Sequence, residues 1–232
     1  MARWDKVAGG LTAIAAGSRT NVWGVNANDN IYKYTNEDAE PWVQIEGGLR
    51  DIGAGADGTV WGVNANAQIY RYVGDRGLNR WVGIPGGLVR ISVGSRTNVW
   101  GVNANGNIYK YTNEDAEPWV QIEGGLTDIG VAADGTVWGV NGSAQIYRYV
   151  GDQGANRWVG IPGGLVRIDA GSRTNVWGVN ANGNIYKYTN DDDNPWVQIP
   201  GNLVDIAAGA DGTVWGVNSK GEIYRYAGDQ PG

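Results

Sequence analysis

The sequence predicts an all-β protein, a six-bladed β-propeller whose blades are four-stranded antiparallel sheets. Three observations predict this fold. Tryptophan recurs every 19 or 20 residues along the whole chain. Each interval of 38 or 39 residues offers four short strand candidates separated by turn residues. The chain also begins with a segment that its last repeat lacks, so the repeats can close into a ring.

The repeat over residues 49–84 shows the four expected strands in order. The first, residues 49–55 (LRDIGAG), is rich in small residues, which suits the crowded innermost position. The second, residues 59–64 (TVWGVN), follows the tight-turn dipeptide Asp-Gly and is rich in β-branched and aromatic residues. The third and fourth are residues 68–72 (QIYRY) and 80–84 (RWVGI). No segment has the 3.6-residue apolar periodicity of a helix, so we expect almost no helix.

The two ends of the sequence favour a closed ring over an open β-solenoid. Residues 2–11 (ARWDKVAGGL) match only a fourth strand and the bend after it, whereas the last repeat stops after its third strand. We therefore expect the N-terminal strand to complete the last blade, which leaves no open sheet edge. A β-trefoil also repeats threefold, but the stronger repeat of 77 residues is too long for its lobes. We expect one propeller domain, residues 1–232, made of six repeats.

One set of tryptophans is expected to pack between the blades. Both faces of a propeller blade contact a neighbour, and the VWGVN strand is apolar on both faces. Burying one aromatic side chain stabilises a fold by roughly 2–3 kcal/mol. Gly62 and its equivalents are expected to let the adjacent blade come close. The tryptophans of this strand are Trp23, Trp61, Trp100, Trp138, Trp177 and Trp215.

The composition excludes several classes of function. A formal charge of −6 and a pI near 4.7 oppose nucleic-acid binding, which needs clustered Lys and Arg. The chain has no histidine and no cysteine, so it lacks the usual general base, the usual metal ligand and any thiolate chemistry. We expect no cofactor, no metal site and no enzyme activity. No apolar run is long enough for a signal peptide or a membrane span, so we expect no membrane insertion and a cytoplasmic location.

Side chains that suit sugar binding recur in every repeat. A partly exposed indole can pack on the apolar face of a sugar, an amide can bind vicinal hydroxyls, and a guanidinium adds donors. The tryptophans that open the fourth strand are Trp4, Trp42, Trp81, Trp119, Trp158 and Trp196. The asparagines of the hairpin between the second and third strands are Asn26, Asn64, Asn103, Asn141, Asn180 and Asn218, for which turn formation is an equally good explanation. The third strand adds Arg71, Arg148, Arg225, Tyr72, Tyr149 and Tyr226.

Acidic loops lie between the third and fourth strands of alternate repeats, at residues 37–40, 114–117 and 191–193. They lack the alternate spacing and the turn glycine of a calcium-binding loop, so we favour solvated loops over calcium sites. Glycoside hydrolysis needs two carboxylates in unlike environments within one pocket. Acids that recur in loops around a ring do not indicate such a pair.

The motifs W-x-x-I-x-G-G-L, I-x-x-G, VWGVN and IYRY resemble the tectonin repeats over all six units, and the fungal (mushroom) six-bladed tectonin lectins would be the nearest relatives. The resemblance implies carbohydrate recognition at several equivalent sites. It further implies O-methylated glycans of bacteria or nematodes, such as O-methylated mannose or fucose, in innate defence. A methyl ether needs a small apolar dent, which Trp, Tyr and Ile beside glycine supply. The motif departs at residues 5–8, at Gly142-Ser143 and at Asn202, which puts the sites there in doubt.

We therefore expect a lectin with up to six shallow sites in or near the grooves between blades. Multivalent binding, within one ring or a homo-oligomer, would raise its avidity. Because TNEDAEPW-type and GDxGxNRW-type loops alternate, we expect two kinds of site, three of each. The alternative is a protein-interaction scaffold that uses one propeller face, which predicts a single asymmetric patch. A third interpretation is a recently duplicated or designed ring without a ligand.

Overall fold

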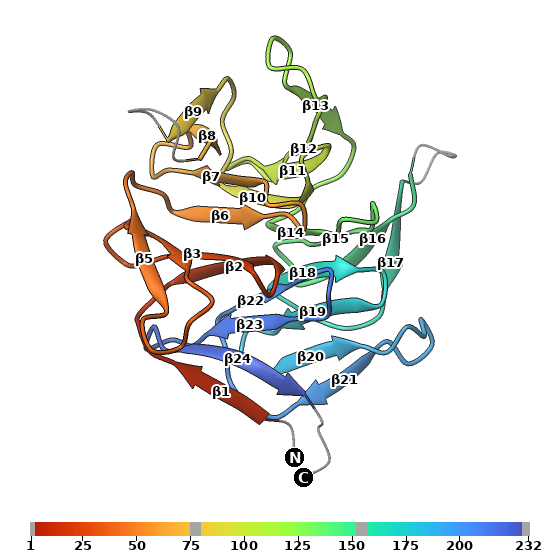
Figure 1. Cartoon of the computed structure of the whole chain (residues 1–232). Helices are drawn as coiled ribbons and strands as arrows, with labels where there is room; N and C mark the ends of the chain where they lie inside the picture. The colour runs from red at the N-terminus through yellow and green to blue at the C-terminus, as the bar shows by residue number, and fades with distance from the viewer. Residues whose placement is uncertain (1–2, 75–79, 152–156, 229–232) are drawn as a thin grey trace.

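The chain forms a ring of six four-stranded antiparallel sheets, seen in a computed structural model (Figure 1). The structure describes residues 3–74, 80–151 and 157–228. Over these residues the secondary structure is β throughout, and none of it is a helix long and apolar enough to cross a membrane. The predicted fold class is confirmed.

The blades are numbered in chain order and share one pattern, with the first strand nearest the axis. Blade 1 contains β2 (Ala13–Ser18), β3 (Asn21–Val25), β4 (Ile31–Tyr34) and β5 (Trp42–Ile45). Blade 2 contains β6 (Asp51–Ala54), β7 (Val60–Val63), β8 (Ile69–Tyr72) and β9 (Trp81–Ile84). Blade 3 contains β10 (Arg90–Ser95), β11 (Asn98–Val102), β12 (Ile108–Tyr111) and β13 (Trp119–Ile122).

The second half of the ring repeats the first. Blade 4 contains β14 (Asp128–Val131), β15 (Val137–Val140), β16 (Ile146–Tyr149) and β17 (Trp158–Ile161). Blade 5 contains β18 (Arg167–Ser172), β19 (Asn175–Val179), β20 (Ile185–Tyr188) and β21 (Trp196–Ile199). Blade 6 contains β22 (Asp205–Ala208), β23 (Val214–Val217), β24 (Ile223–Gly228) and, from the N-terminus, β1 (Arg3–Val7).

Ring closure follows the prediction. The sheet order of blade 6 is β1-β24-β23-β22, and β1 pairs antiparallel with β24 so that Trp4 lies opposite Tyr226 and Val7 opposite Ile223. Figure 1 shows the red first strand β1 lying along the blue last strand β24. The contact joins residues more than two hundred positions apart, so no blade is left with three strands.

The hydrophobic core is divided into six clusters, one in each gap between adjacent blades. The cluster between blades 1 and 2, for example, joins Trp23 and Ile31 to Ile52 and Val60. The six second-strand tryptophans are at most 1% exposed, which confirms that they pack between blades. Each blade therefore depends on both neighbours for burial of its apolar surface.

Glycine at position 62 has a different role from the one expected. A Cβ at Gly62 would collide with Leu49, which lies in the link leading into the same blade, and not with a residue of the neighbouring blade. The innermost glycines do allow blades to meet closely. A Cβ at Gly17 would collide with the Gly55 carbonyl of the next blade, because inner strands converge toward the axis.

Candidate functional site

The outer-strand tryptophans lie in the grooves between blades with part of each ring exposed. Trp158 packs edge-on against Trp100 of blade 3, with ring centroids 6.5 Å apart, and against Tyr149 of its own blade at 5.2 Å. Its indole nitrogen donates a hydrogen bond of 2.8 Å to the Glu123 carbonyl in the bend that enters blade 4. Two ring contacts and this hydrogen bond fix the orientation of the indole.

The same hydrogen bond recurs around the ring. Each outer indole N–H donates at 2.8–2.9 Å to the carbonyl before a bend glycine; the acceptors for Trp4, Trp42, Trp81, Trp119 and Trp196 are Pro200, Ala8, Glu46, Pro85 and Pro162. The polar end of each tryptophan is therefore occupied within the protein. What the ring offers to a ligand is its apolar surface.

One of these grooves contains a well-formed apolar dent of about 300 Å³. Its walls come from blade 3, the bend and blade 4: Ile108, Gly124, Gly125, Leu126, Asn141, Tyr147 and Trp158. Gly124 has φ of 126°, and a Cβ there would lie 3.1 Å from the Trp158 indole nitrogen, so both the backbone and the ring require glycine. The residue types at these positions recur in every repeat, with Asn202 as the exception among the second bend residues.

The hairpin asparagines stabilise the turns between the second and third strands, the role that was the alternative to sugar binding. The Asn141 side-chain oxygen accepts hydrogen bonds of 3.0 Å from the backbone N–H groups of Ser143 and Gln145. Its amide nitrogen donates to the Gln145 side chain at 2.8 Å. The other five asparagines cap their hairpins in the same way. The amide therefore lines the dent with its oxygen already occupied.

The third-strand arginines are held in ion pairs between blades. Arg148 of blade 4 donates two hydrogen bonds of 2.9 and 2.8 Å to Asp192 of blade 5, and a third of 3.1 Å to the Tyr188 hydroxyl. Its guanidinium lies 5.4 Å from the Trp138 ring centre. The hydrogen bond from Arg148 lowers the pKa of the Asp192 carboxyl, and that from Tyr188 adds to the effect. Arg71 with Asp115 and Arg225 with Asp38 repeat the arrangement.

The sequence did not predict these ion pairs. The acidic loops were expected to be solvated, yet one aspartate of each neutralises the arginine of the preceding blade. The signal that could have found them is the coupled alternation: an IYRY strand is always followed by an acidic loop in the next repeat, 44 residues on for Arg71 and Asp115. The alternation of loop types is thus an alternation of inter-blade contacts.

The structure divides the predicted site residues between two places. The outer tryptophans and hairpin asparagines come together in the dents, as Trp158 and Asn141 do. Arg148 instead lines a separate hollow toward blade 5, together with Trp138 and Tyr188. Tyr149 also borders this hollow, but its ring packs on Trp100 and Trp158 in the gap toward blade 3. Arg71 and Tyr72 line the corresponding hollow between blades 2 and 3. Tryptophan, amide and guanidinium therefore do not converge on one pocket.

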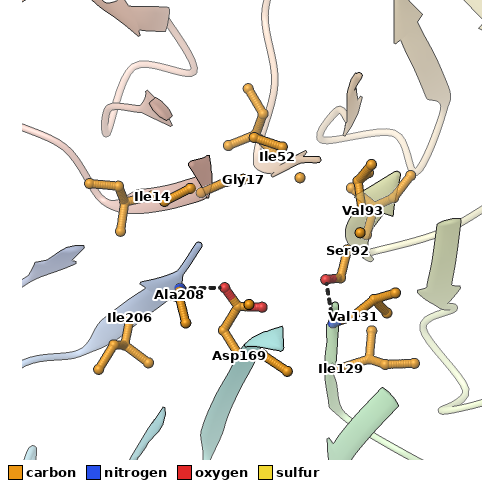
Figure 2. Close-up of a pocket in the computed structure, with 18 of the residues that line it drawn as sticks. Ile14, Gly17, Ile52, Ser92, Val93, Ile129, Val131, Asp169, Ile206 and Ala208 are labelled. Carbon is orange, nitrogen blue, oxygen red and sulfur yellow. Dashed lines mark hydrogen bonds between the residues drawn. The ribbon is translucent and has the colours of Figure 1, made fainter. Parts of the chain in front are cut away.

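The axis of the ring is a narrow channel of about 50 Å³ (Figure 2). Asp169 accepts a hydrogen bond of 2.7 Å from the Ala208 N–H, and the Ser92 hydroxyl accepts one of 3.0 Å from the Val131 N–H. Figure 2 shows that both side chains lie among the inner-strand residues that line the channel. This volume is too small for a sugar ring, so the channel is not a candidate for glycan binding.

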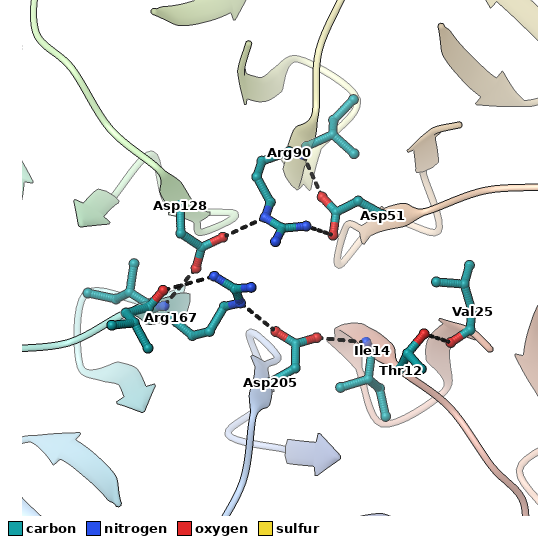
Figure 3. Close-up of polar contacts among 11 residues, drawn as sticks. Thr12, Ile14, Val25, Asp51, Arg90, Asp128, Arg167 and Asp205 are labelled. Carbon is teal, nitrogen blue, oxygen red and sulfur yellow. Dashed lines mark hydrogen bonds and ion pairs between the residues drawn. The ribbon is translucent and has the colours of Figure 1, made fainter. Parts of the chain in front are cut away.

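Charged side chains ring one level of this channel (Figure 3). Arg90 lies 3.6 Å from both Asp51 and Asp128, and Arg167 lies 3.8 Å from Asp205. The first-strand sequence alternates acid and base at this position from blade 2 to blade 6, and this alternation is the feature of the sequence that could have predicted the ring of charges. Blade 1 breaks the alternation, because Ala13 stands where blades 3 and 5 carry Arg90 and Arg167.

Burial raises the pKa of the channel carboxyls. It raises the pKa of Asp169 to about 8, that of Asp205 to about 7 and that of Asp128 to about 6, with the neighbouring arginines opposing the rise for Asp205 and Asp128. Over the residues that the structure describes, no three acidic side chains are placed to hold a metal ion together. At the level of Arg90 and Arg167 the channel carries more acid than base.

Sequence comparison identifies one family. The family model described as "Tectonin domain" matches residues 1–118 and again residues 111–231, and so spans almost the whole chain. A search of the curated proteins gives no match.

Solved structures of low sequence identity share the fold. The WD40 propeller domain of Doa1 superposes with a TM-score of 0.66 at 8% identity, covering 99% of this chain and 98% of that one. A protein of unknown function from Bacteroides thetaiotaomicron gives 0.67 at 14% identity, covering 97% and 72%. YCF48 bound to D1 peptide gives 0.59 at 14% identity, covering 99% and 83%. These likenesses concern the propeller architecture.

Proposed function

Because the chain belongs to the tectonin family, we propose that it is a lectin, a non-enzymatic carbohydrate-binding protein whose ligands occupy the repeated dents between blades. The observation that carries the proposal is the apolar dent beside Trp158, whose wall-forming residue types recur in the other repeats with Asn202 as the one exception. Small repeated pockets suit small repeated ligands. A protein-binding face would need one larger surface, of about 800 Å² per partner.

An O-methyl group on a sugar is the ligand feature that suits the dent best. The floor is apolar, formed by Ile108, Leu126 and the Trp158 ring, and burying one methyl group there is favourable by about 0.8 kcal/mol. Tyr147 and Asn141 stand at the same dent, and each already donates one hydrogen bond to Gln145, so the second N–H of the Asn141 amide and the lone pairs of the Tyr147 hydroxyl are the groups that would bind ring hydroxyls. An unmethylated sugar would leave the floor without a partner, so methylation would set specificity.

The binding is expected to be multivalent. A shallow dent of this size gives weak single-site affinity, and several equivalent dents on one rigid ring raise avidity on the order of 10²–10⁴ when a surface presents many copies of the ligand. Surfaces of bacteria and nematodes that carry methylated glycans are the proposed targets, in a defence role from the cytoplasm. A homo-oligomer would extend the same effect.

The sixth dent differs from the other five. Its bend carries Asn202, whose side chain donates a hydrogen bond of 2.9 Å to the Asn182 carbonyl. Glu222 accepts hydrogen bonds from Lys6, Asn218 and Tyr224, so this dent has an ion pair beside it where the dent of Trp158 has the neutral Gln145. We expect five functional dents and one that binds weakly or not at all.

A glycan array that includes O-methylated mannose and fucose, with the unmethylated sugars as matched controls, tests the proposal. Binding confined to the methylated forms supports it, and no binding to any glycan at high protein density overturns it. A variant that blocks the dents replaces the second bend glycine with asparagine, the residue that this chain already has at position 202. At Gly10, Gly48, Gly87, Gly125 and Gly164 a Cβ would meet its nearest atom at 3.8–3.9 Å, so the fold tolerates the change. Array binding should be lost in that variant while its melting temperature is kept.

The rival function is a protein-interaction scaffold. YCF48 is a propeller that was solved with a bound peptide, so the architecture is compatible with such a role. A scaffold would keep its partner when all five dents are blocked. Retained pull-down of one protein by the blocked variant, together with a silent glycan array, would favour it.

A further inference from the structure

One end of the axial channel carries an incomplete ring of charges (Figure 3). The ring is formed by the residue that begins the innermost strand of each blade. This residue is aspartate in blades 2, 4 and 6, arginine in blades 3 and 5, and alanine in blade 1; in chain order the six are Ala13, Asp51, Arg90, Asp128, Arg167 and Asp205. Blade 1 therefore brings no charge to this level.

At the other end of the same strands the alternation of charges is complete. The turns after the innermost strands carry, in order, Arg19, Asp57, Arg96, Asp134, Arg173 and Asp211. Each of these aspartates accepts the backbone N–H of the arginine in the next blade at 2.9 Å. The departure at position 13 is thus a local one, and it leaves a gap in the ring between Asp205 of blade 6 and Asp51 of blade 2.

The two carboxylates beside the gap are held by the backbone and have oxygen atoms to spare. The Oδ2 atom of Asp205 accepts the Ile14 N–H at 2.9 Å, and that of Asp51 accepts the Ile91 N–H at 2.8 Å. Their Oδ1 atoms lie 3.8 Å from Arg167 Nε and 3.6 Å from Arg90 Nη1. A charge-assisted hydrogen bond is shorter, roughly 2.7–2.9 Å, so both Oδ1 atoms can accept a further donor.

The gap can be reached from the mouth of the channel and has room for a small group. The side chains of Asp205 and Asp51 are 19% and 14% exposed, against 11% for Asp128, which belongs to the blade between the two arginine-bearing blades. All three carboxyl groups line the channel of about 50 Å³. One water-sized group needs roughly 10–15 Å³ of such volume, so the channel takes about four heavy atoms, as many as a guanidinium has.

The charges at this level call for one more cation. Three carboxyl groups face two guanidinium groups, and burial raises the pKa of Asp205 to about 7, with the charges of Asp128 and Asp51 adding to the rise. A monovalent cation beside Asp205 would favour its ionised form. The two equivalent positions in blades 3 and 5 hold guanidinium groups, and a planar guanidinium can donate to two carboxylates at once.

We propose that the gap beside Ala13 binds the guanidinium group of a ligand, which donates to the free oxygens of Asp205 and Asp51 and completes the ring. The group is either the end of an arginine side chain of a protein partner, inserted through the mouth of the channel, or part of a small free compound. Each chain has one such site. The proposal does not rest on sugar binding, because the dent beside Trp158 shares no residue with the channel.

Isothermal titration calorimetry of the full chain with N-acetyl-arginine amide tests the proposal. The control is the matched citrulline compound, which has a similar shape without the charge. We expect one site per chain and about tenfold tighter binding of the arginine compound. Equal binding of the two compounds, or no heat at millimolar concentrations of either, overturns the proposal.

Matched variants locate the site. Ala13→Arg supplies the missing guanidinium from the chain itself and should abolish binding, whereas Ala13→Ser keeps the gap open and should retain it. Asp205→Asn should weaken binding about tenfold, and Asp134→Asn, in the complete ring at the other end of the strands, should leave it unchanged. Undiminished binding by Ala13→Arg overturns the proposal; if that variant does not fold, undiminished binding by Asp205→Asn does so.

A short peptide with one central arginine distinguishes the two sources of the group. Tighter binding of the peptide than of N-acetyl-arginine amide supports a protein partner, and equal binding supports a small free compound. The same peptide with citrulline in place of arginine should not bind, and binding of that peptide overturns the proposal. Binding of methylated sugars should be unchanged in Ala13→Arg, so failure of this proposal and failure of the lectin proposal are distinguishable.

Discussion

Tryptophan has two roles in this ring: one set packs between the blades, and the other set lines the grooves with part of each ring exposed. The two sets differ in the hydrogen-bond acceptor of the indole N–H. The second-strand tryptophan rings are buried. In blades 1, 3 and 5 the indole N–H of this tryptophan donates to an asparagine on the same strand, as Trp23 does to Asn21. The outer rings keep one face open because the bend carbonyl holds the N–H, as Glu123 does for Trp158. Residue identity alone does not separate these environments; the hydrogen-bond partner does.

The strongest residue-scale prediction concerns Asp169 in the channel. Its pKa is raised to about 8 mainly by burial, with Asp128 and Asp205 adding to the rise, whereas an unfolded aspartate has a pKa of about 3.9. Between about pH 4 and pH 8, Asp169 is therefore protonated in the folded chain and ionised in the unfolded chain. The stability that this proton provides is present below about pH 4 and is lost as the pH rises to about 8.

Asp169→Asn should therefore reduce the fall in melting temperature between pH 5 and pH 9. Asparagine keeps an oxygen for the Ala208 N–H and never ionises, so we expect a gain on the order of 1 kcal/mol at pH 9 and little change at pH 5. Thermal melts across this range measure it. Parallel curves for the wild type and the variant would contradict the assignment.

At the scale of elements, the bend between blades is the part that shapes the dent. The first bend glycine is required by its positive φ, for example 125° at Gly47, and by the outer indole beside it. The second glycine leaves room, which Asn202 fills in one bend. The fourth strands of blades 1 to 5 read WVQI or WVGI and only β1 departs, with WDKV, so differences among the first five dents arise outside the fourth strand.

Changing the bend should change the number of sites. Asn202→Gly should raise the stoichiometry of methylated-sugar binding in calorimetry toward six per chain, and Gly125→Asn should lower it by one. The affinity of the remaining sites should not change, because the dents share no residue. Equal stoichiometry in all three proteins would contradict the placement of the sites.

At the scale of the whole molecule, the ring is closed by backbone pairing and braced at its axis. One level of the channel has three aspartates but two arginines: Asp51, Asp128 and Asp205 face Arg90 and Arg167. Blade 1 carries Ala13 where a third arginine would complete the alternation. The sheet of blade 6 depends on a strand from the other end of the chain. The ring of charges can be tested on stability without touching the proposed dents.

Ala13→Arg should complete the ring of charges. A guanidinium there would lie between Asp205 and Asp51 and lower the pKa of both, which stabilises the fold at pH 8 by up to about 1 kcal/mol. Ala13→Met is the control for added side-chain bulk. If the melting temperature of Ala13→Arg at pH 8 is no higher than that of Ala13→Met, the interpretation of the channel as an incomplete ring of charges is wrong.

Removing residues 1–9 should open the ring. It deletes β1, leaves β24 as an unpaired edge and takes away the Trp4 ring that packs on Trp177 and Tyr226. We expect a loss of several kcal/mol and association through the exposed edge. Size-exclusion chromatography and thermal melts measure this, and a peptide of residues 1–10 added in trans should restore a monomer. An unchanged monomeric melt of the truncated chain would contradict closure by β1.

The sequence by itself determined the fold, because a repeat of 38 or 39 residues with four strand signals and complementary ends has few ways to bury its apolar faces. It also determined which tryptophans are buried and that two kinds of loop alternate. Only the tertiary structure decided how the predicted site residues are grouped. Successive residues of a strand face opposite blades, so Arg148 and Tyr147 cannot share a pocket, and the aspartate that neutralises each arginine comes from the next repeat.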